Sequence, residues 1–265
     1  MAEWLRPFLT TYAVLVGAVV GSFLNVVVYR VPRRRSIVRP RSACPACQAP
    51  IPWYDNIPVL SWLVLLGRCR RCRAPISVRY PLVEVAAAAM AGVAFSRHGA
   101  SVVGLEVLVF AWVSLVLGLI DLEHQLLPDV LTYPSIVLGL LASLGGGLVP
   151  PVEALLGAAV GAAVPTLVIV SYRWLRGEDG MGWGDVKYLA AIGAVVGVRD
   201  CLWVLVMAAV VGAVVGIALW VSGRGSGKTA LPFGTFLAGA VILWLYMPEA
   251  WRAVVRALGT YTGPY

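Results

Sequence analysis

Gly180-Met-Gly-Trp-Gly-Asp-Val-Lys-Tyr188 places one acidic residue, Asp185, behind three glycines and directly before an apolar run that ends at Val198. A carboxylate at the mouth of a membrane helix is costly, because it loses water there and finds few partners. Glycines let a ligand or a neighbouring helix approach the backbone closely. The stretch therefore indicates either a site at a membrane surface or a loop that merely ends in an aspartate.

The composition is that of an integral membrane protein. Of 265 residues, 60% are hydrophobic and 13% are charged, and the mean hydropathy is +0.86. A span needs roughly 20 apolar residues, and we predict an all-α polytopic membrane protein with about eight transmembrane helices. Their ranges are 8–29, 82–96, 102–120, 130–144, 152–172, 181–198, 202–221 and 231–246. No internal repeat is evident. Gly17-x-x-x-Gly21 gives the first span a close-packing face.

The segment between the first two spans is basic and carries four of the five cysteines. Residues 30–79 hold 11 of the 21 basic residues and a single acid, Asp55. Cys44-Pro-Ala-Cys47 and Cys69-Arg-Arg-Cys72 lie 21 residues apart. Two CxxC pairs at this spacing predict a four-thiolate tetrahedral site, most typical of zinc. Such zinc is structural because four thiolates leave no position for water. Two disulfides are the alternative, which a reducing cytoplasm disfavours.

The basic residues also predict the orientation of the chain. If the cysteine loop is cytoplasmic, 16 of the 21 basic residues lie on the inner side, as the positive-inside rule requires. Asp121, at the inner end of the third span, and Asp185, at the inner start of the sixth, then share one membrane face with the cysteine loop. Both chain ends would face outward.

The sixth span is short, which bears on Asp185. Val186–Val198 covers about 20 Å as a helix, less than the roughly 30 Å of a bilayer core. Extension back to Met181 draws Asp185 into the membrane zone, where an acid should line a wet cavity.

Two carboxylates at one depth suit the chemistry of an aspartic protease. Close like charges do not both ionise easily, so the pair keeps one shared proton. The ionised partner activates water and the protonated one polarises the scissile carbonyl. The alternative is that Asp121 and Asp185 are unrelated helix-end acids. Of the other acids, Asp129 is a candidate helix cap, and Glu84 either faces a polar cavity or reaches the inner surface.

The motifs of this chain together resemble those of the bacterial prepilin peptidases, the type IV leader peptidase family, over nearly its whole length. They are Gly21-Ser-Phe-Leu-Asn25 with Tyr29-Arg30-Val-Pro32, the two CxxC pairs, Trp53-Tyr-Asp-Asn-Ile-Pro-Val-Leu-Ser-Trp62, Ile76-Ser-Val-Arg-Tyr80-Pro-Leu-Val-Glu84, Asp121 with Leu127-Pro128-Asp129, Gly182-Trp-Gly184-Asp185, and Leu231-Pro-Phe-Gly234. The GxGD motif alone is short, but its combination with the tetracysteine loop and the upstream aspartate is specific.

The resemblance implies an intramembrane aspartyl protease with Asp121 and Asp185 as its catalytic pair and Gly182 and Gly184 in the active-site motif. Its substrates would be prepilins and pseudopilins of type IV pilus and type II secretion systems, cleaved after the glycine that ends a basic leader. Members with the cysteine loop are typically bifunctional and also N-methylate the new terminus with S-adenosylmethionine. Glu84 and Asn25 are the places where we look for the methyl donor.

These implications define the expected organisation. Residues 1–29 form the first transmembrane helix, residues 30–81 a cytoplasmic tetracysteine zinc domain, and residues 82–265 a seven-helix membrane protease core. We expect a multi-pass protein of the bacterial inner membrane, with the zinc loop and active site facing the cytoplasm. Its partners would be the substrates and the lipid bilayer, and no nucleic acid. A peptidase without methylation and a non-catalytic membrane scaffold or transporter remain the alternatives.

Overall fold

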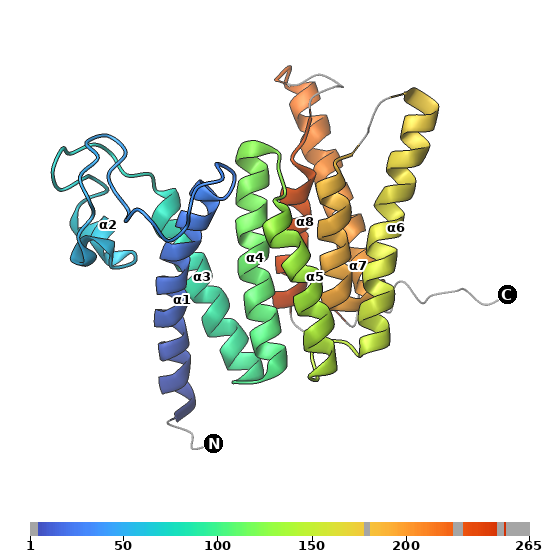
Figure 1. The fold of residues 1–265 in the computed structure, drawn as a ribbon, viewed down its shortest axis with the longest axis horizontal. Coiled ribbons are helices and arrows are strands. Elements are labelled where there is room, and N and C mark those ends of the chain that lie inside the picture. The colour runs from blue at the N-terminus through green and yellow to red at the C-terminus, as the bar shows by residue number, and fades with distance from the viewer. Residues whose placement is uncertain (1–4, 178–180, 225–229, 248–251, 253–265) are drawn as a thin grey trace.

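The structure is a computed structural model that describes residues 5–177, 181–224, 230–247 and 252. Gly180 of the glycine-rich motif lies outside these residues. The regular elements of the described part are helices, which confirms the all-α prediction (Figure 1). They are α1 (Leu5–Arg30), η1 (Trp53–Asn56), α2 (Leu60–Val64), α3 (Arg79–His98), α4 (Val102–His124), α5 (Asp129–Leu144), α6 (Pro151–Arg176), α7 (Trp183–Val221) and α8 (Phe233–Tyr246).

Four of these helices are long and apolar enough to cross a membrane, namely α1, α4, α6 and α7. The apolar helices α5 and α8 are shorter, with 16 and 14 residues. Helical segments occupy all eight ranges expected from the sequence. How many of them span the bilayer remains a prediction.

The 39 residues of α7 are two helical segments joined by a sharp turn. Gly197 has φ 79° and ψ 177°, far from helical values. The Cys201 thiol donates a hydrogen bond of 3.7 Å to the carbonyl oxygen of Leu189, 12 residues earlier. In a straight helix these residues would be about 18 Å apart. The chain therefore reverses at Gly197. The first segment begins at Trp183 rather than at the expected Met181, so Asp185 lies in its first turn.

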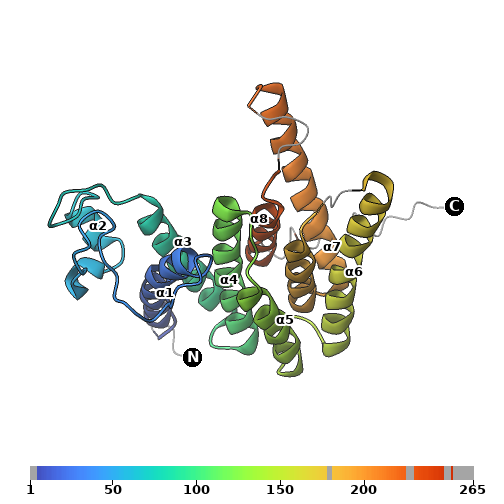
Figure 2. The ribbon, with the colours of Figure 1, turned by 45° about the horizontal axis from the view of Figure 1, so that its top comes forward.

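Several glycines allow close contacts between helices of the bundle. A β-carbon on Gly157 of α6 would lie 2.1 Å from the carbonyl oxygen of Gly193 in α7, so only glycine fits there. A β-carbon on Gly17 or Gly21 of α1 would lie 2.7 Å from atoms of α3. The predicted close-packing face of the first helix is thus its contact with α3, and the two helices lie side by side in both views (Figures 1 and 2).

The cysteine loop and the end of α4 lie at the same end of the bundle. Arg79, which begins α3, forms an ion pair with Glu123 in the last turn of α4. Arg33, just after α1, lies 3.4 Å from the imidazole of His124. Arg97, at the other end of α3, donates to the carbonyl oxygen of Tyr246 at the end of α8. The expectation that Asp121 shares one end with the basic loop therefore holds in the structure.

The cysteine loop contains a repeat that our sequence analysis missed. Residues 44–51 and 69–76 both read Cys-x-x-Cys-x-Ala-Pro-Ile. In each copy the first cysteine N–H donates to the alanine carbonyl oxygen, at 2.9 and 2.8 Å. The residue after the second cysteine, Gln48 or Arg73, has positive φ. Each copy is too short to bury a core of its own, so the two meet at their cysteines.

Candidate active site and metal centre

Asp121 lies in the last turn of α4, where the local sequence ends the helix. Gln125 adopts a left-handed conformation with φ 49°, and its N–H donates to the carbonyl oxygen of Asp121 at 2.8 Å. Pro128 follows and cannot continue a helix. The Asp121 side chain is buried. The end of α4 thus holds a carboxyl group inside the bundle, next to an exposed turn.

Asp185 lies in the first turn of α7. Gly182 is the extended N-cap residue, and the N–H of Asp185 donates to its carbonyl oxygen at 3.1 Å. A β-carbon on Gly184 would lie 2.9 Å from the β-carbon of Leu127. The absence of a side chain at Gly184 therefore lets the start of α7 approach the segment that follows α4. Asp185 is buried by this approach.

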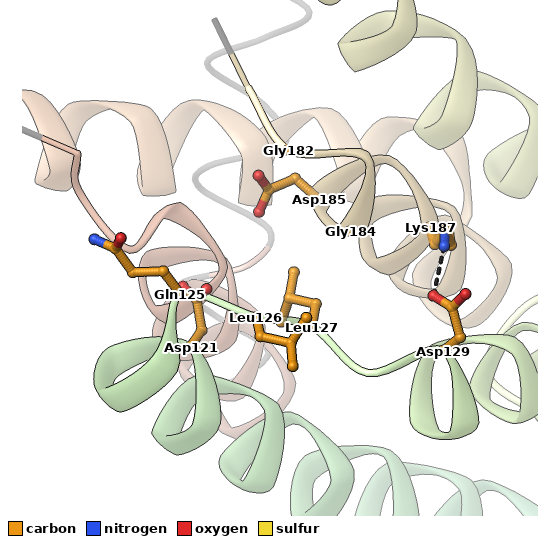
Figure 3. A pocket seen from close by; sticks show the side chains of 9 residues that line it. All are labelled: Asp121, Gln125, Leu126, Leu127, Asp129, Gly182, Gly184, Asp185 and Lys187. Atoms are coloured by element: carbon orange, nitrogen blue, oxygen red, sulfur yellow. Dashed lines mark hydrogen bonds and ion pairs between the residues drawn. The ribbon is translucent and has the colours of Figure 1, made fainter. Parts of the chain in front are cut away.

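The two aspartates line one pocket, although 64 residues separate them in the chain. Figure 3 shows their carboxyl groups facing the same space between the end of α4 and the start of α7. The pocket combines three carboxylates, one lysine and two of the motif glycines. Its lining residues are Asp121, Gln125, Leu126, Leu127, Asp129, Gly182, Gly184, Asp185 and Lys187. The structure thus brings together the four active-site residues expected from the sequence.

The N-terminus of α8 holds Asp121 in place, a role that sequence reasoning missed. The backbone N–H of Thr235 donates to Oδ2 of Asp121 at 2.8 Å, and the Thr235 hydroxyl lies 3.3 Å from the same oxygen. That hydroxyl also donates to the carbonyl oxygen of Gly118 at 2.9 Å. A β-carbon on Gly234 would lie 3.0 Å from Oδ2. The Leu231–Gly234 motif was the available signal, because Thr235 directly follows it.

Asp129 is not the helix cap that the sequence indicated. The N-cap residue of α5 is Pro128, and Asp129 is the first helical residue. Its Oδ1 lies 2.5 Å from the ammonium nitrogen of Lys187. The same nitrogen lies 5.2 Å from the ring centre of Tyr133. The local sequence suggests a cap because an acid stands at the start of a helix, but Lys187 of α7 binds the carboxylate instead.

Asn25 and Glu84 lie at the junction between the cysteine loop and the first helices. The Asn25 amide donates to the carbonyl oxygen of Tyr80 at 3.2 Å, so it joins α1 to α3. Oε2 of Glu84 accepts a hydrogen bond of 2.7 Å from the N–H of Val59. Both side chains are buried. Neither residue is among those that line the Asp121–Asp185 pocket, and each has a structural partner.

The four loop cysteines form the one cluster that could hold a metal ion among the described residues. Their sulfur atoms all lie within 4.8 Å of one another, and the Cys44–Cys72 distance is 3.8 Å. A tetrahedral site with Zn–S bonds of about 2.3 Å has sulfur atoms about 3.8 Å apart. All four cysteines are free thiols rather than disulfides. Hydrogen bonds from the N–H of Cys72 and of Arg71 lower the pKa of Cys69 to about 6, whereas burial and hydrogen bonds with the neighbouring thiols raise the pKa of Cys72 to about 11, so Cys69 ionises first.

Comparisons with known proteins cover both halves of the chain. Residues 15–98 match the model of the bacterial peptidase A24 N-terminal domain, and residues 108–217 match that of the type IV leader peptidase family. A prepilin leader peptidase/N-methyltransferase of Pseudomonas putida is 40% identical, over 89% of this chain and 91% of the relative. The proteins of that name from Aeromonas salmonicida and Neisseria gonorrhoeae are 39% and 36% identical, over 87% and 94% of this chain and 89% and 95% of theirs.

No solved structure matches the chain significantly. The full-length similarity and the two family models agree with each other and with the motifs around Asp121 and Asp185. This chain belongs to the type IV leader peptidase family.

Proposed function

We propose that this protein removes the leader peptide from prepilins and pseudopilins by aspartyl protease chemistry and then N-methylates the new terminus. The observation that carries the proposal is the convergence of Asp121 and Asp185, from the end of α4 and the start of α7, on one pocket. The names of the relatives, prepilin leader peptidase/N-methyltransferase, support the substrate and the second activity.

The two aspartates would act as a pair that shares one proton. The ionised carboxylate takes a proton from water as the oxygen attacks the scissile carbonyl carbon, and the protonated carboxyl gives its proton to the carbonyl oxygen. Collapse of the resulting diol breaks the C–N bond, and the leaving amine receives a proton from the pair. Thr235 donates a hydrogen bond to Oδ2 of Asp121, so Oδ1 of Asp121 is the oxygen that would take part in proton transfer.

The location of the pocket suits a substrate with one polar and one apolar part. The pocket lies at the end of the bundle where the basic loop begins, which we assign to the cytoplasmic face by the positive-inside rule. The leader would stay at this surface, and the apolar helix of the substrate would reach the pocket from within the bilayer. Gly182 and Gly184 leave room for a peptide backbone beside Asp185.

A single assay tests both activities. Full-length protein in liposomes is incubated with a purified prepilin and S-adenosylmethionine, and the product is weighed by mass spectrometry. We expect a product without the leader that carries one methyl group at its N-terminus. Omission of S-adenosylmethionine should give the cleaved, unmethylated product. Cleavage without any methylation would show that the protein is a peptidase only. An intact prepilin would favour a non-catalytic scaffold or transporter.

The methyl donor is assigned from the names of the relatives rather than from a pocket. Glu84 already accepts a hydrogen bond from Val59 and is 7% exposed, and the amide of Asn25 bridges two helices. Oδ1 of Asn25, by contrast, is buried without a hydrogen-bond partner among the described residues, so Asn25 keeps one free acceptor that a ligand could use. We derive no methyl-transfer step through these two residues.

We propose that the metal of the cysteine cluster is zinc and that its role is structural. Wild-type protein should contain about one zinc ion per chain. Cys44→Ser removes a buried ligand and should reduce the zinc content to background, measured by elemental analysis of purified protein. Cys201→Ser is the matched control, since Cys201 is buried in α7, and it should keep its zinc. Wild-type protein without zinc, or with a disulfide at Cys44, would contradict the assignment.

A further inference from the structure

The short helix α2 and the turn after it leave an apolar surface uncovered. Leu60, Leu63, Val64 and Leu66 are 60%, 54%, 76% and 82% exposed, and we call these four residues the α2 face. The neighbouring Trp62 points the other way, because its indole N–H donates to the carbonyl oxygen of Ile76 at 3.1 Å. Four large apolar side chains that emerge from one short segment indicate a surface that another apolar phase covers.

Contacts with α3 fix the height of α2 relative to the membrane helices. The N–H of Val59, the residue before α2, donates to Oε2 of Glu84 at 2.7 Å. Glu84 lies five residues inside α3, about 7.5 Å along its axis, and its side chain leans back toward the helix start. Its backbone packs against Gly21, nine residues before the end of α1.

The beginning of α2 is therefore level with the first turns of α3 and below the end of α1. Figure 1 shows the same placement, with α2 beside the upper turns of α1 rather than above them. Because α1 is one of the candidate membrane spans, a bilayer around α1 would have its surface near the level of the α2 face.

The charge of the segment that contains the α2 face indicates the kind of surface it meets. Residues 30–79 carry 11 arginines and one acid, Asp55. Arg70 pairs with Asp55 at 2.6 Å and lowers the pKa of its carboxyl group, so this acid is neutralised by its partner. Trp53 is 80% exposed in the same segment. Aromatic and apolar side chains within a basic surround are typical of elements that bind the interface of an anionic bilayer.

We propose that the α2 face inserts into the boundary between headgroups and acyl chains of the bilayer that surrounds the protein, with arginines of the loop on anionic headgroups. The insertion anchors the cysteine domain beside α1 and α3. The insertion also gives a reason for the buried hydrogen bond between Glu84 and the N–H of Val59, because that hydrogen bond sets the depth of α2. Substrate that covers this face instead is an outcome that the experiment distinguishes.

Photo-crosslinking of the full-length protein tests the insertion. Benzoylphenylalanine replaces Leu63 or Val64, one at a time, and the protein is placed in nanodiscs of phosphatidylcholine with phosphatidylglycerol. Leu15, 62% exposed on α1, is the positive control, and the exposed Gln48 of the first cysteine repeat is the control at the surface. We expect lipid adducts at positions 63 and 64, found by mass spectrometry, in at least about tenfold higher yield than at position 48.

Two results would overturn the proposal. Lipid adducts at positions 63 and 64 no more frequent than at position 48 would place the α2 face in water. Adducts to an added prepilin that replace the lipid adducts would make it a substrate-binding surface. Retention of zinc by each variant shows that the domain is folded, so neither result can be attributed to misfolding.

Discussion

Asp121→Asn and Asp185→Asn should each reduce prepilin cleavage by about a thousandfold, because each removes one of the two groups that move protons in the reaction. Asparagine has nearly the shape of aspartate, so the pocket keeps its form. The double variant should lose little more than either single one, because residues that act as a unit are not additive. Initial rates of leader removal in liposomes measure the effect.

The matched control is Glu106→Gln on the same helix as Asp121. Glu106 is buried too, and its Oε2 accepts a hydrogen bond of 2.7 Å from the N–H of Leu148, which the glutamine carbonyl can replace. It lies 15 residues from Asp121, about 22 Å along α4. We expect cleavage within about threefold of wild type, since the hydrogen bond survives. Undiminished cleavage in a folded Asp121→Asn or Asp185→Asn protein would refute the dyad.

Gly234→Val should reduce kcat by about a hundredfold with little change in KM, because displacement of a catalytic group by about 1 Å has effects of this size. A β-carbon at position 234 would lie 3.0 Å from Oδ2 of Asp121 and 2.9 Å from the methyl carbons of Leu127. Leucine can move aside, but the valine methyl groups also need the space that the carboxylate occupies. Steady-state cleavage of a prepilin over a range of substrate concentrations separates kcat from KM.

Gly239→Val supplies the same substitution on the same helix without the contact. A β-carbon at Gly239 has no neighbour within 4 Å. Both variants lose the same glycine freedom and gain the same branched side chain in α8. Equal kcat values in the two variants would show that α8 does not position Asp121.

Part of the site could be predicted because its determinants are local. The spacing of Cys44, Cys47, Cys69 and Cys72 indicates a metal cluster in any fold, since a CxxC turn places two sulfur atoms on one side of the backbone. The asymmetry of basic residues indicated which ends of the helices lie together. Asp121 and Asp185 could then be assigned to the same end, without knowledge of how α4 and α7 pack.

Other parts could not be predicted because they depend on partners far away in the chain. Thr235 reaches Asp121 across 114 residues, and the contact exists only because α8 packs on α4. Lys187 lies 58 residues further along the chain and binds the carboxylate of Asp129, which the sequence alone had suggested as a helix cap. The sequence shows Glu84 only as an acid in an apolar helix, and its role became clear from the hydrogen bond that it accepts from the N–H of Val59. The cysteine repeat was visible in the sequence and was overlooked.

The sequence by itself determined that this protein is helical and membrane-embedded, that four cysteines can share a metal, and that two aspartates lie at one end of the bundle. Hydropathy and charge carry the information on helices and ends, because they report how each segment partitions between water and lipid. The spacing of the cysteines carries the information on the metal cluster. Only the tertiary structure decided that Asp121 and Asp185 open on one pocket, that Thr235 holds the first of them, and that α2 lies level with the first turns of α3. These features depend on which helices pack together, and the close approach of helix backbones at a few glycines sets that packing.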